Sequence, residues 1–188
     1  MILLHGLFSD AQMNWIKFGH AERIAAEGFR VIMPDLRAHG LSGKPHEQLH
    51  YPQGVLVRDL KELIDHLGLT EFDLGGFSLG ARTVIEAVIG GVRPRRAILS
   101  GTGLDVLTNW ERRSRFYVEA VDRFDEAGQG DPHWFAVQFM KTMKVDREAA
   151  RLLLGTMRDR EDKHEMVDAF DMPTLVVCGE QDDDNGSA

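Results

Sequence analysis

A serine between two glycines is the first group in the sequence whose residue types and spacing could do chemistry. The segment reads Gly76-Phe77-Ser78-Leu79-Gly80 and stands between a short apolar run and a longer stretch of helical periodicity. In that setting the glycines permit a sharp, strained turn that lifts a serine hydroxyl clear of a sheet. We therefore predict that Ser78 is a nucleophile. A flexible turn is the alternative interpretation of the same five residues.

A serine nucleophile needs backbone N–H donors for the oxyanion that forms on the attacked carbonyl group. The residue after the serine, Leu79, supplies one such N–H. A second turn, His5-Gly6-Leu7-Phe8, follows the first apolar run of the chain. Its glycine allows the backbone to approach a ligand closely. We expect the N–H of Leu7 to be the second donor, with Phe8 as the less favoured choice.

Short apolar runs alternate with longer helix-period segments along the chain, and these are the elements that must position the two turns. Such alternation indicates βα units and a parallel sheet. Between residues 105 and 170 the strand signal gives way to aromatic-rich helical patterns, so this region interrupts a single α/β domain. Strands are predicted at 2–4, 29–33, 72–74, 97–99 and 173–179, and helices at 15–26, 55–67 and 79–89.

In combination, these segments resemble the α/β-hydrolase superfamily over nearly the whole chain. The resemblance implies a mostly parallel α/β-hydrolase sheet flanked by helices, with a helical cap insertion that covers the pocket and shapes substrate choice. It also implies that His39 is a turn residue and not a base. The motifs that carry the resemblance are the turn at 5–8, Asn14-Trp15, the segment PDLRAHGLS at 34–42, and the glycine-flanked serine at 76–80.

The resemblance divides the chain into three parts. Relative to the family, the chain is expected to lack the first two strands and the last strand, and so to be truncated at both ends. The net charge of −8 lies entirely in the residues after 104, because the residues before them carry equal numbers of acidic and basic groups. The expected parts are 1–104, the first part of the core; 105–170, the helical cap insertion; and 171–188, a core strand with the acid loop.

The family places the acid of its catalytic triad after the penultimate strand, in a Gly-x-x-Asp pattern. Gly179-Glu180-Gln181-Asp182 matches this pattern, so the resemblance assigns Asp182 the role of orienting a histidine. Asp105 is the alternative acid, since some relatives carry it after the preceding strand. A solvated acidic loop is the interpretation without a function.

No histidine follows Asp182 in the sequence, although the order in this fold is serine, acid, histidine. Among the eight histidines, His5 belongs to the expected oxyanion turn, whereas His133 and His164 fall in the expected cap. We therefore expect this chain to lack the catalytic histidine and to be nearly inactive as it stands.

The expected function is that of a serine hydrolase, which cleaves a carboxylic ester with a small or apolar acyl part through an acyl-enzyme on Ser78. A lactonase or a C–C bond hydrolase on the same scaffold would look identical at this level. The alternative is a non-catalytic fragment that self-associates through open sheet edges, because loss of the last family strand would expose residues 173–178.

Composition narrows the classes of partner. An acidic pI near 5.4 without a basic run disfavours nucleic acid and anionic membrane surfaces. Metal-ligand spacings and complete nucleotide-binding motifs are missing, so no metal or cofactor is expected. The apolar runs are too short for a membrane helix and the amino terminus does not read as a secretory signal, so a cytoplasmic location is expected. The single cysteine, Cys178, is expected to be buried and inert.

Overall fold

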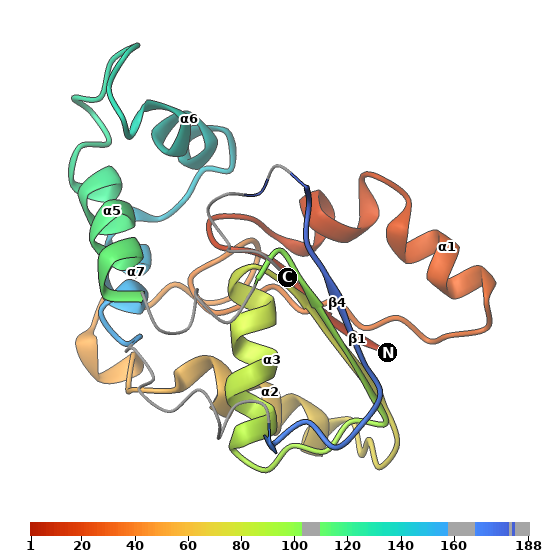
Figure 1. The fold of residues 1–188 in the computed structure, drawn as a ribbon. Coiled ribbons are helices and arrows are strands. Elements are labelled where there is room, and N and C mark those ends of the chain that lie inside the picture. The colour runs from red at the N-terminus through yellow and green to blue at the C-terminus, as the bar shows by residue number, and fades with distance from the viewer. Residues whose placement is uncertain (103–109, 158–167, 181, 183–188) are drawn as a thin grey trace.

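A four-stranded parallel sheet lies at the centre of the computed structural model, which describes residues 1–102, 110–157, 168–180 and 182 (Figure 1). The strands stand in space in chain order, β1-β2-β3-β4. Because they are parallel, their carboxyl ends line one edge of the sheet, where ligands bind in open α/β folds. The strands are β1 (Ile2–Leu4), β2 (Asp73–Phe77), β3 (Arg96–Ser100) and β4 (Thr174–Val177).

The segment 29–33, predicted as a strand, contributes only a single bridge to the sheet. Ile32 pairs with Ile2 in parallel, and its carbonyl oxygen accepts a hydrogen bond from the N–H of Leu3 at 2.9 Å. The partner strand β1 is only three residues long, so the ladder that this segment can form with it is short. Pro34, which has no N–H to donate to a ladder, then ends the segment. The prediction of a strand over 29–33 therefore overestimates its length, because only Ile32 pairs.

Helices cover both faces of the sheet: α2 (Val55–His66) and α3 (Leu79–Ile89) lie on one face and α1 (His20–Ala26) on the other (Figure 1). Helix α3 is buried on nearly every side, which its almost wholly apolar sequence predicts. It packs against β1, β2 and β3 and against α2. The helix that begins immediately after Ser78 is thus held in place by contacts with three of the four strands.

The helix predicted over 15–26 is split into two pieces. A π-helical turn occupies Gln12–Ile16, and α1 starts only at His20. Between them Gly19 adopts a left-handed conformation, with φ of 75°. Glycine reaches this region without steric cost, and one left-handed residue is enough to interrupt a right-handed helix.

Between β3 and β4 the described residues form helices and no strand: α5 (Trp110–Asp122), α6 (Trp134–Thr142) and α7 (Arg147–Leu154). Helix α7 presents Ala149 and Leu153 to the core of the sheet and Ala150 and Leu154 to a second apolar cluster. That second cluster joins the three helices to Phe8 from the turn after β1. None of the described helices combines the length and the apolar character needed to cross a membrane.

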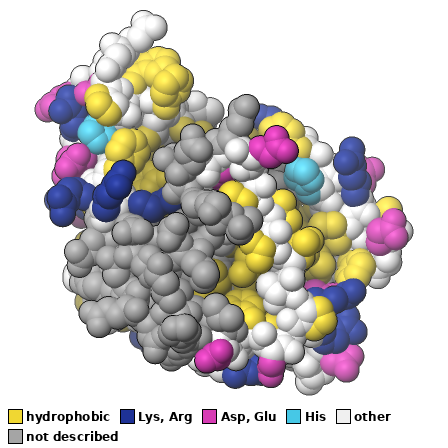
Figure 2. All heavy atoms as spheres, in the orientation of Figure 1, with side chains coloured by type: hydrophobic (Ala, Val, Ile, Leu, Met, Phe, Trp, Pro, Cys, Tyr) yellow, Lys and Arg dark blue, Asp and Glu magenta, His cyan; other side chains and the backbone are white. Residues whose placement is uncertain are grey.

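The edge strand β4 is exposed along its whole length. Leu175, Val176 and Val177 retain 56%, 47% and 45% of their accessible surface, and Figure 2 shows apolar side chains gathered on the face where β4 runs. Cys178, next in the chain, is only partly buried. The expectation of a buried cysteine is therefore wrong, because an apolar run at the sheet edge is covered less than one inside it.

Candidate active site

Ser78 occupies a strained turn between β2 and α3. Its φ of 52° and ψ of −110° lie outside the regions that residues with a Cβ normally adopt. The N–H of Ser78 donates to the carbonyl oxygen of Ser100 at 2.8 Å, and its own carbonyl accepts from the N–H of Arg82 at 2.9 Å. The turn is thus fixed by the neighbouring strand on one side and by the first turn of α3 on the other.

The two glycines around Ser78 are required by close backbone approach. A Cβ on Gly76 would overlap the backbone of Gly80 and lie 2.5 Å from the nitrogen of Ala81. A Cβ on Gly80 would overlap the carbonyl of Leu4 at the end of β1. Neither neighbour is a flexible side chain, so both positions exclude any other residue. The sequence pattern therefore reflects the packing of α3 onto two strands.

The turn after β1 lies directly beside Ser78. A Cβ on Gly6 would be 3.6 Å from the Cβ of Ser78, and the N–H of Gly6 donates to the Oδ1 atom of Asn14 at 2.8 Å. Phe8 has a left-handed φ of 60°, and its N–H donates to the Nε2 atom of His39 at 3.0 Å. Among residues that the structure describes, none accepts a hydrogen bond from the N–H of Leu7. The N–H of Phe8 is therefore already hydrogen-bonded, whereas within the described residues the N–H of Leu7 has no acceptor.

Leu79, the other expected donor, is the first residue of α3. The first N–H groups of a helix have no intrahelical acceptor and attract negative charge. Within the described part of the chain, the N–H of Leu79 has no hydrogen-bond acceptor. The structure thus brings Ser78, the Leu7 turn and the start of α3 to one edge of the sheet.

The side chains of His5 and His39 both form hydrogen bonds with backbone groups near this edge of the sheet. Nε2 of His5 accepts from the N–H of Leu36 at 2.9 Å, and its Nδ1 lies 2.8 Å from the carbonyl oxygen of Gly6. Nδ1 of His39 lies 2.9 Å from the carbonyl oxygen of Arg37. Each ring therefore accepts through Nε2 and donates through Nδ1, which requires the neutral form.

Burial explains why these two rings are neutral. The pKa of His39 is lowered to about 3, mainly by desolvation and also by the neighbouring His5 ring, whose centroid lies 5.1 Å away. Desolvation also lowers the pKa of His5. Neither histidine has a ring nitrogen left to take a proton from Ser78, in agreement with the interpretation of His39 as a turn residue.

Asp35 organises the loop that holds His39. Its Oδ1 accepts from the N–H of Ala11 at 2.9 Å and its Oδ2 from the N–H of Leu41 at 2.7 Å. A Cβ on Gly40, which has a φ of 48°, would overlap this carboxylate. The acidic residue of the 34–42 motif therefore stabilises a turn.

Asp182 follows β4, two strands away from β2, which carries Ser78. Its N–H donates to the carbonyl oxygen of Gly179 at 3.1 Å, and the Sγ of Cys178 lies 3.8 Å from its Oδ2. The two candidate side chains come from the same edge of the sheet, with β3 between their strands. Asp105, the alternative acid, lies outside the described residues.

The other described histidines are engaged away from Ser78 or exposed. His46 contacts both Asp146 and Glu148 at the start of α7, with nitrogen to oxygen distances of 2.9 Å and 3.2 Å. His133 lies 3.1 Å from Asp131 and 3.3 Å from Glu119. Within the described ranges, no histidine is hydrogen-bonded to Ser78. The remaining histidines are His20 and His66, exposed on helices, His50, 3.9 Å from Glu47, and His164, outside the described residues.

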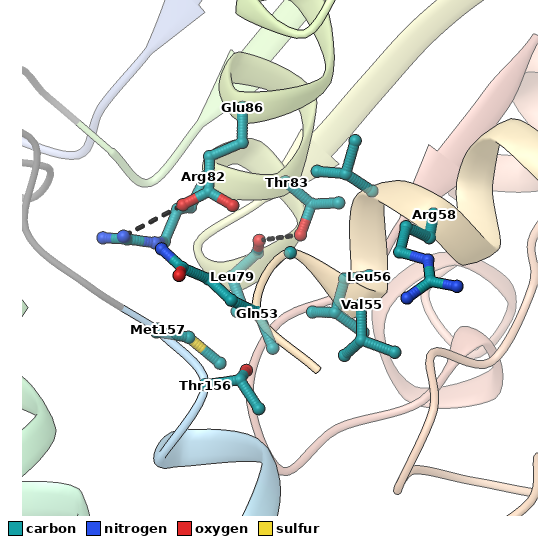
Figure 3. Close-up of a pocket in the computed structure, with 12 residues that line it drawn as sticks. Gln53, Val55, Leu56, Arg58, Leu79, Arg82, Thr83, Glu86, Thr156 and Met157 are labelled. Atoms are coloured by element: carbon teal, nitrogen blue, oxygen red, sulfur yellow. Dashed lines mark hydrogen bonds and ion pairs between the residues drawn. The ribbon is translucent and has the colours of Figure 1, made fainter. Parts of the chain in front are cut away.

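A cavity of about 470 Å³ lies beside α3, next to the serine turn but not lined by Ser78. Figure 3 shows Leu79, Arg82 and Glu86 from α3 on one side of it and Val55 from α2 on another. Arg82 is 2% exposed, and its Nη2 lies 2.9 Å from a carboxylate oxygen of Glu86. The sequence analysis missed this buried ion pair. Its signal is an arginine and a glutamate four residues apart in an otherwise apolar helix.

Among the residues that the structure describes, no group of three histidine, cysteine, aspartate or glutamate side chains is arranged to hold a metal ion.

Comparison with known proteins identifies the family. A family model for the alpha/beta hydrolase fold matches residues 1–161. The chain belongs to the α/β-hydrolase family.

Among curated proteins, this α/β hydrolase is similar to a fluoroacetate dehalogenase from a Burkholderia species, with 28% identity over 141 residues, covering 73% of this chain and 42% of that protein. An epoxide hydrolase from Caballeronia sordidicola is 28% identical over 139 residues, which cover 73% of this chain and 39% of that protein. The chain thus spans less than half the length of these curated relatives.

Among solved structures, this α/β hydrolase is similar to a thermophilic esterase from Thermogutta terrifontis, with a TM-score of 0.68 and 25% identity, covering 95% of this chain and 70% of that one. An esterase from Exiguobacterium antarcticum has a TM-score of 0.69 and 20% identity, covering 93% and 71%. The second likeness establishes the fold alone.

Proposed function

We propose that the protein is a serine hydrolase that cleaves a carboxylic ester of a small molecule through an acyl-enzyme on Ser78. The observation that carries the proposal is the strained backbone of Ser78, held between two glycines that tolerate no Cβ. Such strain persists only where the surrounding structure imposes it, and it is common at active sites. A serine turn without a function would have no need of it.

The oxyanion of the tetrahedral intermediate would be held by the N–H groups of Leu7 and Leu79. The hydrogen bond from Phe8 to His39 supports Leu7 over Phe8, because it removes the competing donor. Leu79 adds the positive end of the α3 dipole to its N–H. Donors fixed in advance stabilise developing charge without reorganisation during the reaction.

Asp182 is the proposed acid, and its partner would be a histidine that the sequence does not contain after position 182. His5 and His39 use both ring nitrogens for the backbone, so neither replaces it. We infer that this chain of 188 residues hydrolyses esters slowly by itself. The oxyanion donors and substrate binding would leave an acceleration of roughly 10³–10⁴ over water.

The identity of the nucleophile favours acyl substrates over those named for the curated relatives. Attack of a serine oxygen on an epoxide or an alkyl halide carbon yields an ether, which water does not cleave under mild conditions. Attack on an acyl carbon yields an ester, which water hydrolyses to regenerate the serine. A lactone fits the same chemistry, and C–C bond hydrolysis stays open. The aromatic-rich helices α5 and α6 of the proposed cap favour an apolar acyl group.

The test is covalent labelling of Ser78 by a fluorophosphonate, read by intact mass and peptide mapping, with and without free imidazole to replace a missing base. We expect a single label on Ser78, faster with imidazole, and none on Ser78→Ala. The matched control is Ser100→Ala, at the end of the neighbouring strand, which should label like the parent protein. A folded protein that stays unlabelled at Ser78 even with imidazole would overturn the proposal.

A second candidate function rests on the exposure of β4. We propose as the alternative that the protein is a non-catalytic scaffold that associates through this sheet edge, because an exposed strand offers unpaired N–H and C=O groups to another chain. Size-exclusion chromatography with light scattering tests it. A dimer disrupted by Val176→Lys supports the scaffold, and a monomer at all concentrations contradicts it.

A further inference from the structure

The ring of Phe77 lies at the carboxyl edge of the sheet, immediately before the serine turn. Phe77 is the last residue of β2, and 39% of its surface is exposed. The four residues before it in β2 are all buried. A large aromatic ring that stays accessible at this edge is available to a ligand.

Two glycines make room for this ring, one after each of the strands that flank β2. A Cβ on Gly6, which follows β1, would lie 3.0 Å from Cδ1 of Phe77, and a Cβ on Gly101, which follows β3, would lie 2.6 Å from its Cε2. The ring therefore spans the ends of three strands. Its two edges are clamped by backbone, so its position is fixed while one part of it remains exposed.

Gly6 lies close to both the Phe77 ring and Ser78. The point where a Gly6 side chain would start is 3.0 Å from the Phe77 ring and 3.6 Å from the Cβ of Ser78. The N–H of Leu7 follows directly in the chain. An acyl group bonded to Ser78, with its oxygen toward Leu7, would thus extend over the space that Phe77 borders.

We propose that the exposed part of the Phe77 ring holds the acyl group of the substrate and selects flat, apolar acyl groups such as benzoyl over acetyl. This inference rests on the proposed serine hydrolase function and names its substrate class. Aromatic rings gain from offset or edge-to-face contact with other rings, beyond the burial of apolar area. Phe77 is then a specificity-determining residue that acts at the acyl side of the site.

The experiment compares Phe77→Ala, Phe77→Leu, Ser78→Ala and the control Phe29→Ala. Phe29 packs beneath Arg96 at the opposite end of β3, with 5.6 Å from the guanidinium carbon to its ring centroid. Benzoate and acetate binding are measured by ligand-observed NMR, which needs no nucleophile. Hydrolysis of p-nitrophenyl benzoate and p-nitrophenyl acetate is measured with imidazole present, and thermal melting verifies that each variant folds.

We expect Phe77→Ala to weaken benzoate binding by about tenfold or more. The ratio of kcat/KM for the benzoyl ester to that for the acetyl ester should fall by a similar factor, because the loss of an apolar pocket contact has effects of about this size. For Phe77→Leu, both quantities should lie between those of Phe77→Ala and those of the parent protein. Phe29→Ala should match the parent protein in both. An unchanged ratio and unchanged benzoate binding in both folded Phe77 variants would overturn the inference and leave the serine hydrolase proposal intact. Hydrolysis by Ser78→Ala at the parent's rate, after the rate with imidazole alone is subtracted, would overturn that proposal instead, while benzoate binding would still report on Phe77.

Discussion

The Nε2 atom of His39 accepts a hydrogen bond from the backbone N–H of Phe8 at 3.0 Å, across 31 residues of sequence. Phe8 is held there in a left-handed conformation. The bond fixes the direction of the turn after β1 and thereby determines which N–H group remains available near Ser78. A side chain from one loop thus sets the backbone geometry of another.

This relationship predicts how stability depends on acid. The pKa of His39 is lowered to about 3 from the ordinary value near 6.5, so between these values the unfolded chain binds a proton that the folded chain excludes. A lowered folded-state pKa gives stability that is complete above pH 6.5 and is lost as the pH falls. The loss is about 1.4 kcal/mol per pH unit for one such group.

Replacement of His39 by Gln removes that group from the titration. We expect His39→Gln to cost about 2 kcal/mol or more at pH 7.5, since two buried hydrogen bonds are disturbed. Its stability should then fall less steeply than the parent's between pH 6 and pH 4. Urea unfolding at several pH values measures both effects, and parallel pH profiles for the two proteins would contradict the prediction.

Backbone strain at Ser78 predicts that glycine is a more stable replacement than alanine at this position. Glycine adopts a positive φ without the cost that a Cβ imposes, which is about 1–3 kcal/mol at such positions. We expect Ser78→Gly to be more stable than Ser78→Ala by about 1 kcal/mol, after the larger entropy loss of glycine is subtracted. Urea denaturation of the two variants measures this difference. Equal stabilities would mean that the turn is unstrained.

Close packing of Gly80 predicts a large loss of stability on adding one methyl group. The Cβ of Gly80→Ala would overlap the carbonyl of Leu4, so either α3 or β1 must shift. We expect a loss of at least about 3 kcal/mol, read by thermal or urea unfolding. The control is Gly43→Ala, where a Cβ meets nothing within 4 Å, and its stability should match the parent within about 1 kcal/mol.

The His46 ion pairs predict an opposite dependence on pH at the start of α7. The hydrogen bond with Asp146, helped by the charges of Glu148 and Glu47, raises the pKa of His46, while Lys44 also faces Asp146. A raised folded-state pKa gives stability that is present at low pH and is lost as the pH rises through that pKa. We expect His46→Gln to lower the melting temperature at pH 6 and to leave it unchanged at pH 9.

The control for that experiment is His66→Gln, which changes an exposed histidine on α2. This control substitution should leave the melting temperature unchanged at both pH 6 and pH 9. A His46→Gln variant that loses the same amount at pH 6 and pH 9 would show that the contact stabilises α7 through packing and not through charge.

Elements with strong local signals could be predicted from the sequence. The bounds of α3 and the placement of the serine turn follow from glycine spacing and apolar periodicity, and both agree with the structure. The break at Gly19 and the short pairing of Ile32 could not be foreseen, since each depends on one residue's conformation or on a partner distant in the chain. Local patterns report propensity, whereas strand length is decided by neighbours.

The arrangement of the candidate site was predictable only in part. Ser78 and the Leu7 turn lie side by side because the parallel strands that carry them end at one edge. The commitment of Phe8 to His39 needed the structure, because it joins two loops. The exposure of Phe77 and the burial of Arg82 needed it as well, since both contradict what residue type alone suggests.

Helix α7 has a consequence for how the molecule unfolds. Its two apolar sides, Ala149 with Leu153 and Ala150 with Leu154, belong to different clusters. If one cluster melted, α7 would lose the contacts of one apolar side, and a helix of eight residues is too short to persist without tertiary support. We therefore expect the sheet and the helices between β3 and β4 to unfold in a single cooperative transition, with α7 as the element that couples them.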